Sequence, residues 1–421
     1  MRVLQVIWDG GGNTAPQLAI ARALVNRGHE VRVLAHDVQR EKVAATGAEF
    51  AAYRHAPQAD GSRPETDLLR DWEARTPVGA FARVRDRLMY GPAGLFARDV
   101  IDLLASWPAD VVAWDYLLLG GGLGAEQAGV PSAAVVHQVY PLPAEGVPPF
   151  GPGLQPARGP AGRLRDAVIR TAFVRLFAPG LTSLNTARVE LGLRPLEDPF
   201  GQLLGADRLL VLTSPTFDFA GSAPLPDNVR YTGPVLERAP AADWQPSWDA
   251  DDQRPLILAS FSTTFMDQRG LVERTVEALS GLPVRALVTT GPAVDSATIS
   301  PGDNVRVEQF VPHAAVLPHA RLAITHCGMG TVHAALAAGV PLVCMPGGRD
   351  QDDVAARLVF HRAGIKVSQG ATAAKLRGAV ERALADDELL AGARRFADEF
   401  AGEDGAGRAA DELERLASAG V

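Results

Sequence analysis

The sequence predicts an α/β protein with two doubly wound parallel sheets. Short apolar strands alternate with helices in both halves of the chain, and a stretch rich in Pro, Asp and Trp separates the halves at residues 215–254. The length of 421 residues suits two domains of roughly 200 residues each. With 47% hydrophobic residues, each half can bury a full core.

The first half opens on a strand–helix–strand unit. A Gly-rich loop follows the first strand, and Ala15-Pro16 then opens a helix, because proline suits the first helical turn. Gly28 ends this helix, and a small-residue helix over 120–129 lies between two later strands. The strands expected in this half are residues 2–8, 31–35, 108–115 and 132–136.

Two segments of the first half lack this regular alternation. Residues 56–105 are expected to form loosely patterned helices with scattered aromatic residues. Residues 141–160 contain seven prolines and predict a long loop, a kind of segment that usually carries function. Helices are expected again over 161–177 and 184–191.

The second half repeats the strand–helix pattern from residues 255–260 onward. A buried strand at 321–325 leads to a Gly-rich turn and to a helix that starts near Thr331. The next strand, at 341–345, leads into a polar loop, and the final helices start near Asp386. The alternation again indicates a parallel sheet.

The Gly-rich turn after the strand at 321–325 points to an anion site. Such a turn at a helix start presents free backbone N–H groups and the positive end of the helix dipole to a phosphate. His326 can add a hydrogen bond or a positive charge. Asp350 and Gln351 leave the next strand at the same edge, where open α/β sheets bind ligands. We therefore expect a diphosphate at one end and a hydroxyl-rich group at the other.

These residues resemble the nucleotide-sugar signature of the family-1 glycosyltransferases, which have the two-domain GT-B fold. The resemblance runs from about Leu256 to about Val367, and it is looser over residues 1–35 and 107–137, which resemble the actinobacterial branch that decorates polyketides and other natural products. It includes the segments Thr325-His326-Cys327-Gly328-Met329-Gly330-Thr331, Phe310-Val311-Pro312-His313 and Tyr231-Thr232-Gly233-Pro234-Val235.

The resemblance implies two Rossmann-like domains facing a central cleft. The expected boundaries are an acceptor-binding domain over 1–214, a linker over 215–254, a nucleotide-sugar domain over 255–395, and a C-terminal helix over 396–421 that crosses back to the first domain.

The resemblance also implies the donor-binding residues. His326 and the amides of Gly328, Met329, Gly330 and Thr331 would hold the diphosphate, whereas Asp350 and Gln351 would bind the sugar hydroxyls. Ser262 and Thr263 would face the diphosphate, and Val311 would contact the base through its backbone. Ala334 stands where many relatives that use UDP-sugars carry a Glu for the ribose hydroxyls, which favours a dTDP-sugar over a UDP-sugar.

The general base is where the sequence departs from the family pattern. Asn13 occupies the position of the family's catalytic His, and an amide cannot take a proton. Asp115 matches the Asp that orients that His. Three explanations stay open: Asp115 or Asp9 acts as the base, His137 reaches in from the neighbouring strand, or the acceptor is acidic or carbon-nucleophilic enough to need little help. Trp72, Phe81 and Tyr90 fit an acceptor pocket or a core.

Charge and composition exclude other classes of partner. A net charge of −8 argues against nucleic acid or an anionic membrane as the main partner. Neither a signal peptide nor an apolar run of ~20 residues is visible, so we expect a soluble cytoplasmic protein. The two cysteines, Cys327 and Cys344, form no metal-ligand spacing and are expected to be reduced.

The resemblance therefore implies an inverting, metal-independent hexosyltransferase of antibiotic or other natural-product biosynthesis. Its donor would be a nucleoside-diphosphate sugar, with a deoxyhexose favoured, and its acceptor a hydrophobic aglycone. No cofactor is expected, and the sequence is compatible with a homodimer. Two alternatives stay open: a nucleotide-sugar epimerase or hydrolase on the same fold, and a non-catalytic relative that has lost its base at Asn13.

Overall fold

The computed structural model describes residues 1–61, 63–236, 244, 248–249, 251–261, 264–291 and 294–419. The chain forms two compact units. Unit 1 contains Met1–Phe150, Pro156–Val235 and Asp404–Val421, and unit 2 contains Gly151–Gln155 and Leu236–Glu403. Each unit holds one parallel sheet with helices packed on it, so the predicted fold class is confirmed.

The sheet of unit 1 has seven strands in the order β3-β2-β1-β4-β5-β6-β7. These are β1 (Arg2–Val6), β2 (Glu30–Ala35), β3 (Glu49–Ala52), β4 (Val111–Asp115), β5 (Ser132–Val136), β6 (Arg208–Val211) and β7 (Val229–Tyr231). The central strands are fully buried, as expected for parallel strands covered on both faces. Because β7 pairs with β6, the first sheet extends past residue 214, where the linker was predicted to begin.

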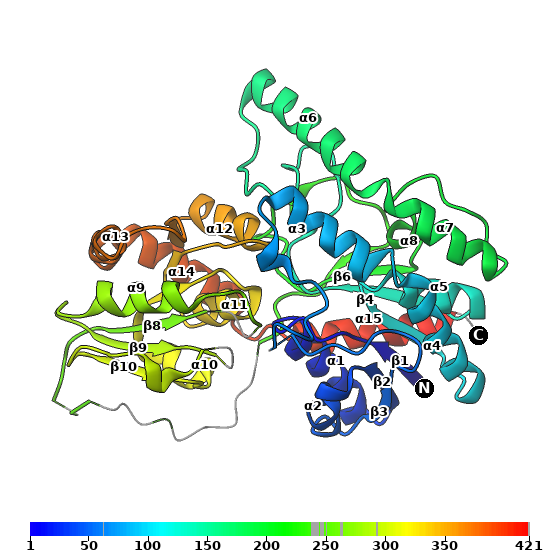
Figure 1. Ribbon diagram of the computed structural model, residues 1–421, viewed down its shortest axis with the longest axis horizontal. Helices are drawn as coiled ribbons and strands as arrows, with labels where there is room; N and C mark the ends of the chain where they lie inside the picture. The colour runs from blue at the N-terminus through cyan, green and yellow to red at the C-terminus, as the bar shows by residue number, and fades with distance from the viewer. Residues whose placement is uncertain are drawn as a thin grey trace. The chain divides into compact units, whose positions relative to one another are not determined.

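The helices of unit 1 surround this sheet (Figure 1). They are α1 (Thr14–Asn26), α2 (Arg40–Ala44), α3 (Pro77–Val84), α4 (Ala93–Ser106), α5 (Leu119–Ala128), α6 (Gly159–Phe177), α7 (Gly180–Glu190), α8 (Gly201–Leu204) and α15 (Gly405–Ala419). Short 3-10 turns lie at Asp37–Gln39, Asp71–Glu73 and Phe219–Ser222, and one π turn at Arg85–Met89. Helix α5 packs closely on α4, because a Cβ on Gly120 would lie 2.2 Å from the carbonyl oxygen of Ala93.

Unit 2 has a six-stranded sheet in the order β10-β9-β8-β11-β12-β13. Its strands are β8 (Leu256–Ser260), β9 (Arg285–Thr289), β10 (Val305–Glu308), β11 (Ala320–Thr325), β12 (Leu342–Cys344) and β13 (Gly364–Lys366). Its helices are α9 (Arg269–Leu279), α10 (His313–Val316), α11 (Met329–Ala337), α12 (Gln351–Phe360), α13 (Ala373–Ala385) and α14 (Asp387–Phe400), with 3-10 turns at Ser296–Thr298 and Leu317–His319. Helices α9 and α13 share one core with the sheet.

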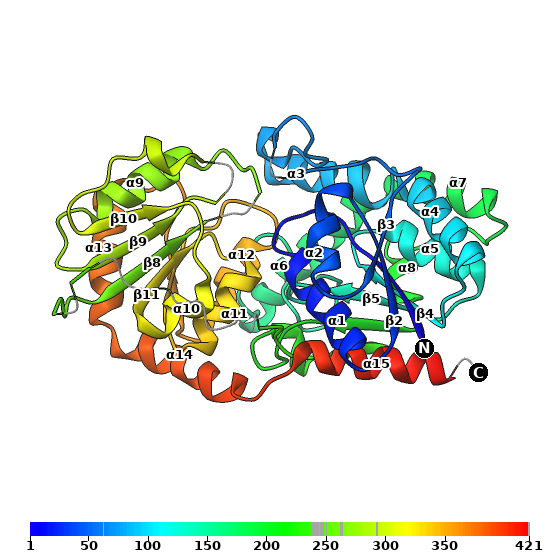
Figure 2. The same cartoon turned by 90° about the horizontal axis from the view of Figure 1, so that it is seen from below.

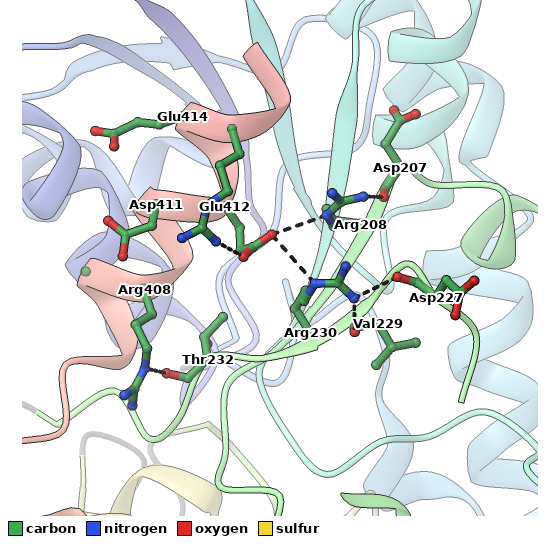
Figure 3. Close-up of polar contacts among 12 residues, drawn as sticks. Asp207, Arg208, Asp227, Val229, Arg230, Thr232, Arg408, Asp411, Glu412 and Glu414 are labelled. Atoms are coloured by element: carbon green, nitrogen blue, oxygen red, sulfur yellow. Dashed lines mark hydrogen bonds and ion pairs between the residues drawn. The ribbon is translucent and has the colours of Figure 1, made fainter. Parts of the chain in front are cut away.

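The last helix, α15, packs on unit 1 beside α1 (Figure 2). Its buried face includes Ala409 and Leu413, which share a core with Leu24 of α1. Figure 3 shows the polar side of the contact, where Glu412 faces Arg208 of β6 and Arg230 of β7 at 3.2 Å and 3.9 Å. The segment predicted as one C-terminal helix over 396–421 is divided, because α14 lies in unit 2 and α15 in unit 1.

Replacing Glu412 with alanine is expected to lower the free energy of unfolding by about 1–3 kcal/mol, because the Glu412 side chain is 10% exposed and holds Arg208 by a charged hydrogen bond. Urea unfolding measures the change. The control is Asp411→Ala on the same helix, whose pair with Arg27 is exposed and should contribute less than about 1 kcal/mol. Equal effects of the two substitutions would contradict the prediction.

In the described part of the chain, no single helix has the length and apolar content to cross a bilayer. Helices α6 and α7 reach that length and apolar content only together, as a pair bent by 48°.

Candidate active site

Three predicted residues meet at one edge of the unit 1 sheet. Strands β1, β4 and β5 are neighbours, so their carboxyl ends lie side by side. Asn13 precedes α1 in the loop after β1, Asp115 is the last residue of β4, and His137 directly follows β5. The parallel topology therefore brings together residues that are far apart in the sequence.

Asp115 is fully buried and holds the centre of this group. Its Oδ2 accepts hydrogen bonds from Asn13 Nδ2 at 2.9 Å and Gln17 Nε2 at 2.7 Å, and its Oδ1 accepts from the Leu117 amide at 3.0 Å. Burial by itself would raise the pKa of Asp115, but the charge and side-chain contact of His137 and the hydrogen bonds from Asn13 and Leu117 hold the pKa below its usual value. Asp115 is thus a buried carboxylate that supports its neighbours and has no surface to offer a substrate.

Both polar atoms of the Asn13 side chain form hydrogen bonds. Its Nδ2 donates to Asp115 Oδ2 and, at 3.1 Å, to the Trp8 carbonyl oxygen, and its Oδ1 accepts from the Gly10 amide at 3.0 Å. The residue is 3% exposed. These contacts fix the loop between β1 and α1, and they leave Asn13 no free group with which to contact an acceptor.

His137 lies beside Asp115 and keeps part of its ring accessible. The His137 Nδ1 is 3.4 Å from Asp115 Oδ2, an ion-pair distance that is long for a hydrogen bond. The His137 side chain is 15% exposed, whereas that of Asp115 is 0% exposed. Since Nδ1 faces the carboxylate, Nε2 on the other side of the imidazole is the nitrogen available to an acceptor. The arrangement is a histidine oriented by a buried aspartate.

Asp9 belongs to a separate set of contacts. Its backbone N–H donates to His36 Nδ1 at 3.2 Å, and its carboxylate accepts from the Gly61 amide at 3.0 Å. Burial raises the pKa of Asp9, although the hydrogen bond from Gly61 opposes the shift. Among the described residues, no recorded hydrogen bond or ion pair joins Asp9 to Asp115 or His137.

Gln17 is a site residue that we did not predict from the sequence. Besides its bond to Asp115, its Nε2 lies 3.2 Å from the Asn13 carbonyl oxygen, one turn earlier in the chain. The spacing of four residues from Asn13 places both on one face of the start of α1. This spacing was the only feature of the sequence that could have indicated Gln17 as a site residue, because a glutamine on the buried face of a helix does not by itself predict a functional role.

The Gly-rich turn of unit 2 opens helix α11 at the carboxyl end of β11. Gly328 is the N-cap and provides no side-chain cap, so the first amides of α11, those of Met329, Gly330 and Thr331, point out of the helix end. Gly330 is exposed and Thr331 is half-buried, whereas the Met329 side chain is buried. This is the geometry of an anion site.

His326 lies against the same turn. A Cβ on Gly328 would lie 2.7 Å from His326 Nε2, so only glycine allows the imidazole to lie this close to the N-cap. His326 is 8% exposed, and its Nδ1 has no hydrogen-bond partner in the described part of the chain. Burial, with the charge of Arg349 adding to it and a hydrogen bond to the Ser260 backbone opposing it, lowers the pKa of His326 to about 4. His326 is therefore neutral near pH 7, and it can donate a hydrogen bond rather than supply the positive charge considered from the sequence.

Asp350 and Gln351 lie at the start of α12, a helix that we did not predict from the sequence. Asp350 is the half-buried N-cap residue. Gln351 is only 3% exposed, and its Oε1 accepts a hydrogen bond from the Gly347 amide at 2.7 Å. Gln351 thus holds the loop between β12 and α12, and Asp350 is the more accessible of the two side chains.

Val311 is the only one of the remaining predicted donor positions that lies within the described residues. The Val311 side chain is buried, whereas its neighbour Phe310 is 74% exposed. Ser262 and Thr263 lie outside the described residues, and the next residue, Thr264, accepts a hydrogen bond from Arg349 at 3.3 Å. A hollow at the ends of β8 and β9 is lined by Thr264, Phe265, Met266, Asp267, Gln268, Arg269, Thr290, Val294 and Asp295.

Known proteins resemble this chain over its whole length. The model of the erythromycin biosynthesis protein CIII-like C-terminal domain matches residues 275–416. 4'-Demethylrebeccamycin synthase of Lentzea aerocolonigenes is 32% identical over 99% of each chain, and demethyllactenocin mycarosyltransferase of Streptomyces fradiae is 28% identical over 98% of this chain and 86% of its own. The crystal structure of glycosyltransferase VinC in complex with dTDP aligns over 100% of both chains with a TM-score of 0.72 and 21% identity, which supports the fold. The chain therefore belongs to the family-1 glycosyltransferases of the GT-B fold, in the branch of natural-product biosynthesis, and is a transferase.

Proposed function

We propose that this glycosyltransferase inverts the anomeric centre of a dTDP-deoxyhexose as it transfers the sugar to a hydrophobic aglycone. The observation that carries the proposal is the pair formed by His137 and the buried Asp115 in unit 1. As the acceptor atom bonds to the anomeric carbon, its proton moves to His137 Nε2. The bond from that carbon to the β-phosphate oxygen breaks, and its electron pair leaves with the diphosphate.

The geometry of unit 1 supports His137 as the base over the other candidates. The side-chain amide of Asn13 already forms hydrogen bonds to neighbouring residues, and the Asp115 side chain is fully buried. Imidazole exchanges a proton near neutral pH, which suits a general base. The ionised Asp115 stabilises the imidazolium that forms when His137 takes the acceptor's proton.

The start of α11 supports a nucleoside diphosphate as the leaving group. The amides of Met329 to Thr331 and the neutral His326 can donate hydrogen bonds to phosphate oxygens. These donors would offset the charge that develops on the diphosphate, without a metal ion. Ala334, on the same helix, offers no acceptor to a ribose 2'-hydroxyl, and 2'-deoxyribose lacks that group. The dTDP complex of VinC points in the same direction.

A group of phenylalanines in unit 1 supports a hydrophobic acceptor. Phe81, Phe150 and Phe173 are half-buried, and their ring centroids lie 6.1–6.3 Å apart. Phe173 stacks on Phe200 at 5.7 Å and an angle of 14°. Tyr90, by contrast, is a core residue, since it is 1% exposed and its hydroxyl donates to the Pro199 carbonyl oxygen.

Calorimetric titration with dTDP and with UDP tests the donor assignment. We expect micromolar binding of dTDP, weaker binding of UDP, and at least about tenfold weaker dTDP binding by His326→Ala, because one hydrogen bond to a charged phosphate is lost. His319→Ala, an exposed histidine of the same unit, is the control and should bind as the unmodified protein does. If neither nucleotide binds, the proposal is wrong and the non-catalytic reading gains support.

A further inference from the structure

Arg349 reaches across the edge of the unit 2 sheet. It lies in the loop between β12 and α12, and its Nη1 donates a hydrogen bond to Thr264 Oγ1, in the loop after β8, at 3.3 Å. Strand β11 lies between β8 and β12, and all three run parallel. The hydrogen bond therefore joins the loops that follow the two neighbours of β11, and β11 itself leads through His326 into α11.

One further observation places the Arg349 charge near the Gly-rich turn. The charge of Arg349 is felt at His326, where it adds to burial in lowering the pKa of the imidazole. Arg349 also has φ +55°, a left-handed backbone conformation that non-glycine residues adopt rarely. His326 itself is more than nine-tenths buried against this turn, with Nδ1 unpartnered among the described residues.

We infer that Arg349 supplies the positive charge that holds the donor diphosphate at the start of α11. The proposed function requires that the charge of a diphosphate be offset, and the neutral His326 and the amides of α11 provide hydrogen bonds but no full charge. Arg349 links the loops on either side of β11, and a guanidinium forms charge-assisted hydrogen bonds with phosphate oxygens in a planar, forked geometry. This inference rests on the proposed function and adds a residue that binds the phosphates and not the nucleoside.

Titration of Arg349→Gln with dTDP, dTMP and thymidine tests the inference. Glutamine keeps a polar side chain of intermediate length and removes the charge. We expect dTDP binding to weaken about ten- to a hundredfold, dTMP binding to weaken less, and thymidine binding to stay unchanged. Arg349→Lys should recover part of the loss, because a lysine keeps the charge without the fork. The difference between Arg349→Gln and the unmodified protein should shrink as salt is added.

Arg362→Gln is the matched control. Arg362 is also an arginine of unit 2 with a positive φ, +53°, but it lies after α12 and pairs with Glu388 on the surface. Unchanged dTDP binding by Arg349→Gln, beside normal binding by the unmodified protein, would overturn the inference and leave the proposed function standing. Equal weakening by Arg349→Gln and Arg362→Gln would also overturn it. Absence of dTDP and UDP binding by the unmodified protein would overturn the proposed function together with the inference.

Discussion

His137→Ala is expected to lower kcat by about 10²–10⁴-fold, because the acceptor loses the group that takes its proton. Binding of dTDP should not change, since His137 lies in unit 1 and the diphosphate site in unit 2. The assay uses dTDP-glucose as donor, with 2-naphthol and 2-naphthylmethanol as probe acceptors of similar shape. The loss should be larger for the alcohol than for the more acidic phenol, because a weaker acid depends more on the base.

The control for His137→Ala is His55→Ala. His55 also forms a histidine–aspartate pair in unit 1, with Asp102 at 2.9 Å, but both side chains are exposed. This variant should retain normal turnover. A merely structural role of His137 would slow both acceptors equally and would not respond to added imidazole. That outcome would refute His137 as the base, whereas partial rescue of His137→Ala by imidazole would support it.

Asn13→Asp is expected to lower the free energy of unfolding by about 3–5 kcal/mol at pH 7.5. The substitution replaces the Nδ2 donor, 2.9 Å from Asp115, by a carboxylate oxygen, and both groups are buried. Two like charges at this distance raise the pKa of one carboxyl group in the folded state far above its value in the unfolded chain. The folded variant then binds a proton that the unfolded chain releases above about pH 4, so its stability should rise as pH falls from 7.5 towards 5.

Asn13→Ala is the matched control for this prediction. Alanine removes the same hydrogen bonds without adding a charge, so we expect a loss of about 1–3 kcal/mol. The difference in unfolding free energy between Asn13→Ala and the unmodified protein should be nearly independent of pH from 7.5 to 5. Urea unfolding at several pH values separates the cases. If Asn13→Asp lost stability on acidification, the contact between residue 13 and Asp115 would be contradicted.

Several central strands were well predicted because buried parallel strands leave a strong apolar signal, but the internal strands β6 and β9 were not predicted. The strand predicted at 132–136 has those bounds in the structure, and that at 255–260 differs by one residue. Short edge strands gave no such signal. Strand β7, Val229–Tyr231, is half-buried and lies in a segment whose prolines and charges are typical of a linker. Its strand structure depends on pairing with β6, which local sequence does not report.

The predicted site residues that the structure describes lie at the edges of the two sheets. The hydrogen bonds that their side chains form could not be predicted from the sequence. The topology alone places Asp115 and His137 on adjacent strand ends. That Asn13 has no free polar atom depends on three partners, two of them in the preceding loop. The sequence motif contained Arg349, but neither its hydrogen bond to Thr264 nor its positive φ is visible in a pattern of residue types.

The position of α15 has a consequence for the nascent chain. Residues 236–403, which form most of unit 2, are synthesised between the body of unit 1 and the helix that completes its core. At about 5–20 residues per second, a ribosome needs roughly 10–30 s to make this stretch. During that time the apolar face of α1 around Ile20 and Leu24, which later packs on Leu413, stays uncovered. Unit 2 can thus reach its folded state before unit 1 is complete. Until α15 is made, the apolar surface that the newly made protein exposes lies on α1, in the half that is synthesised first.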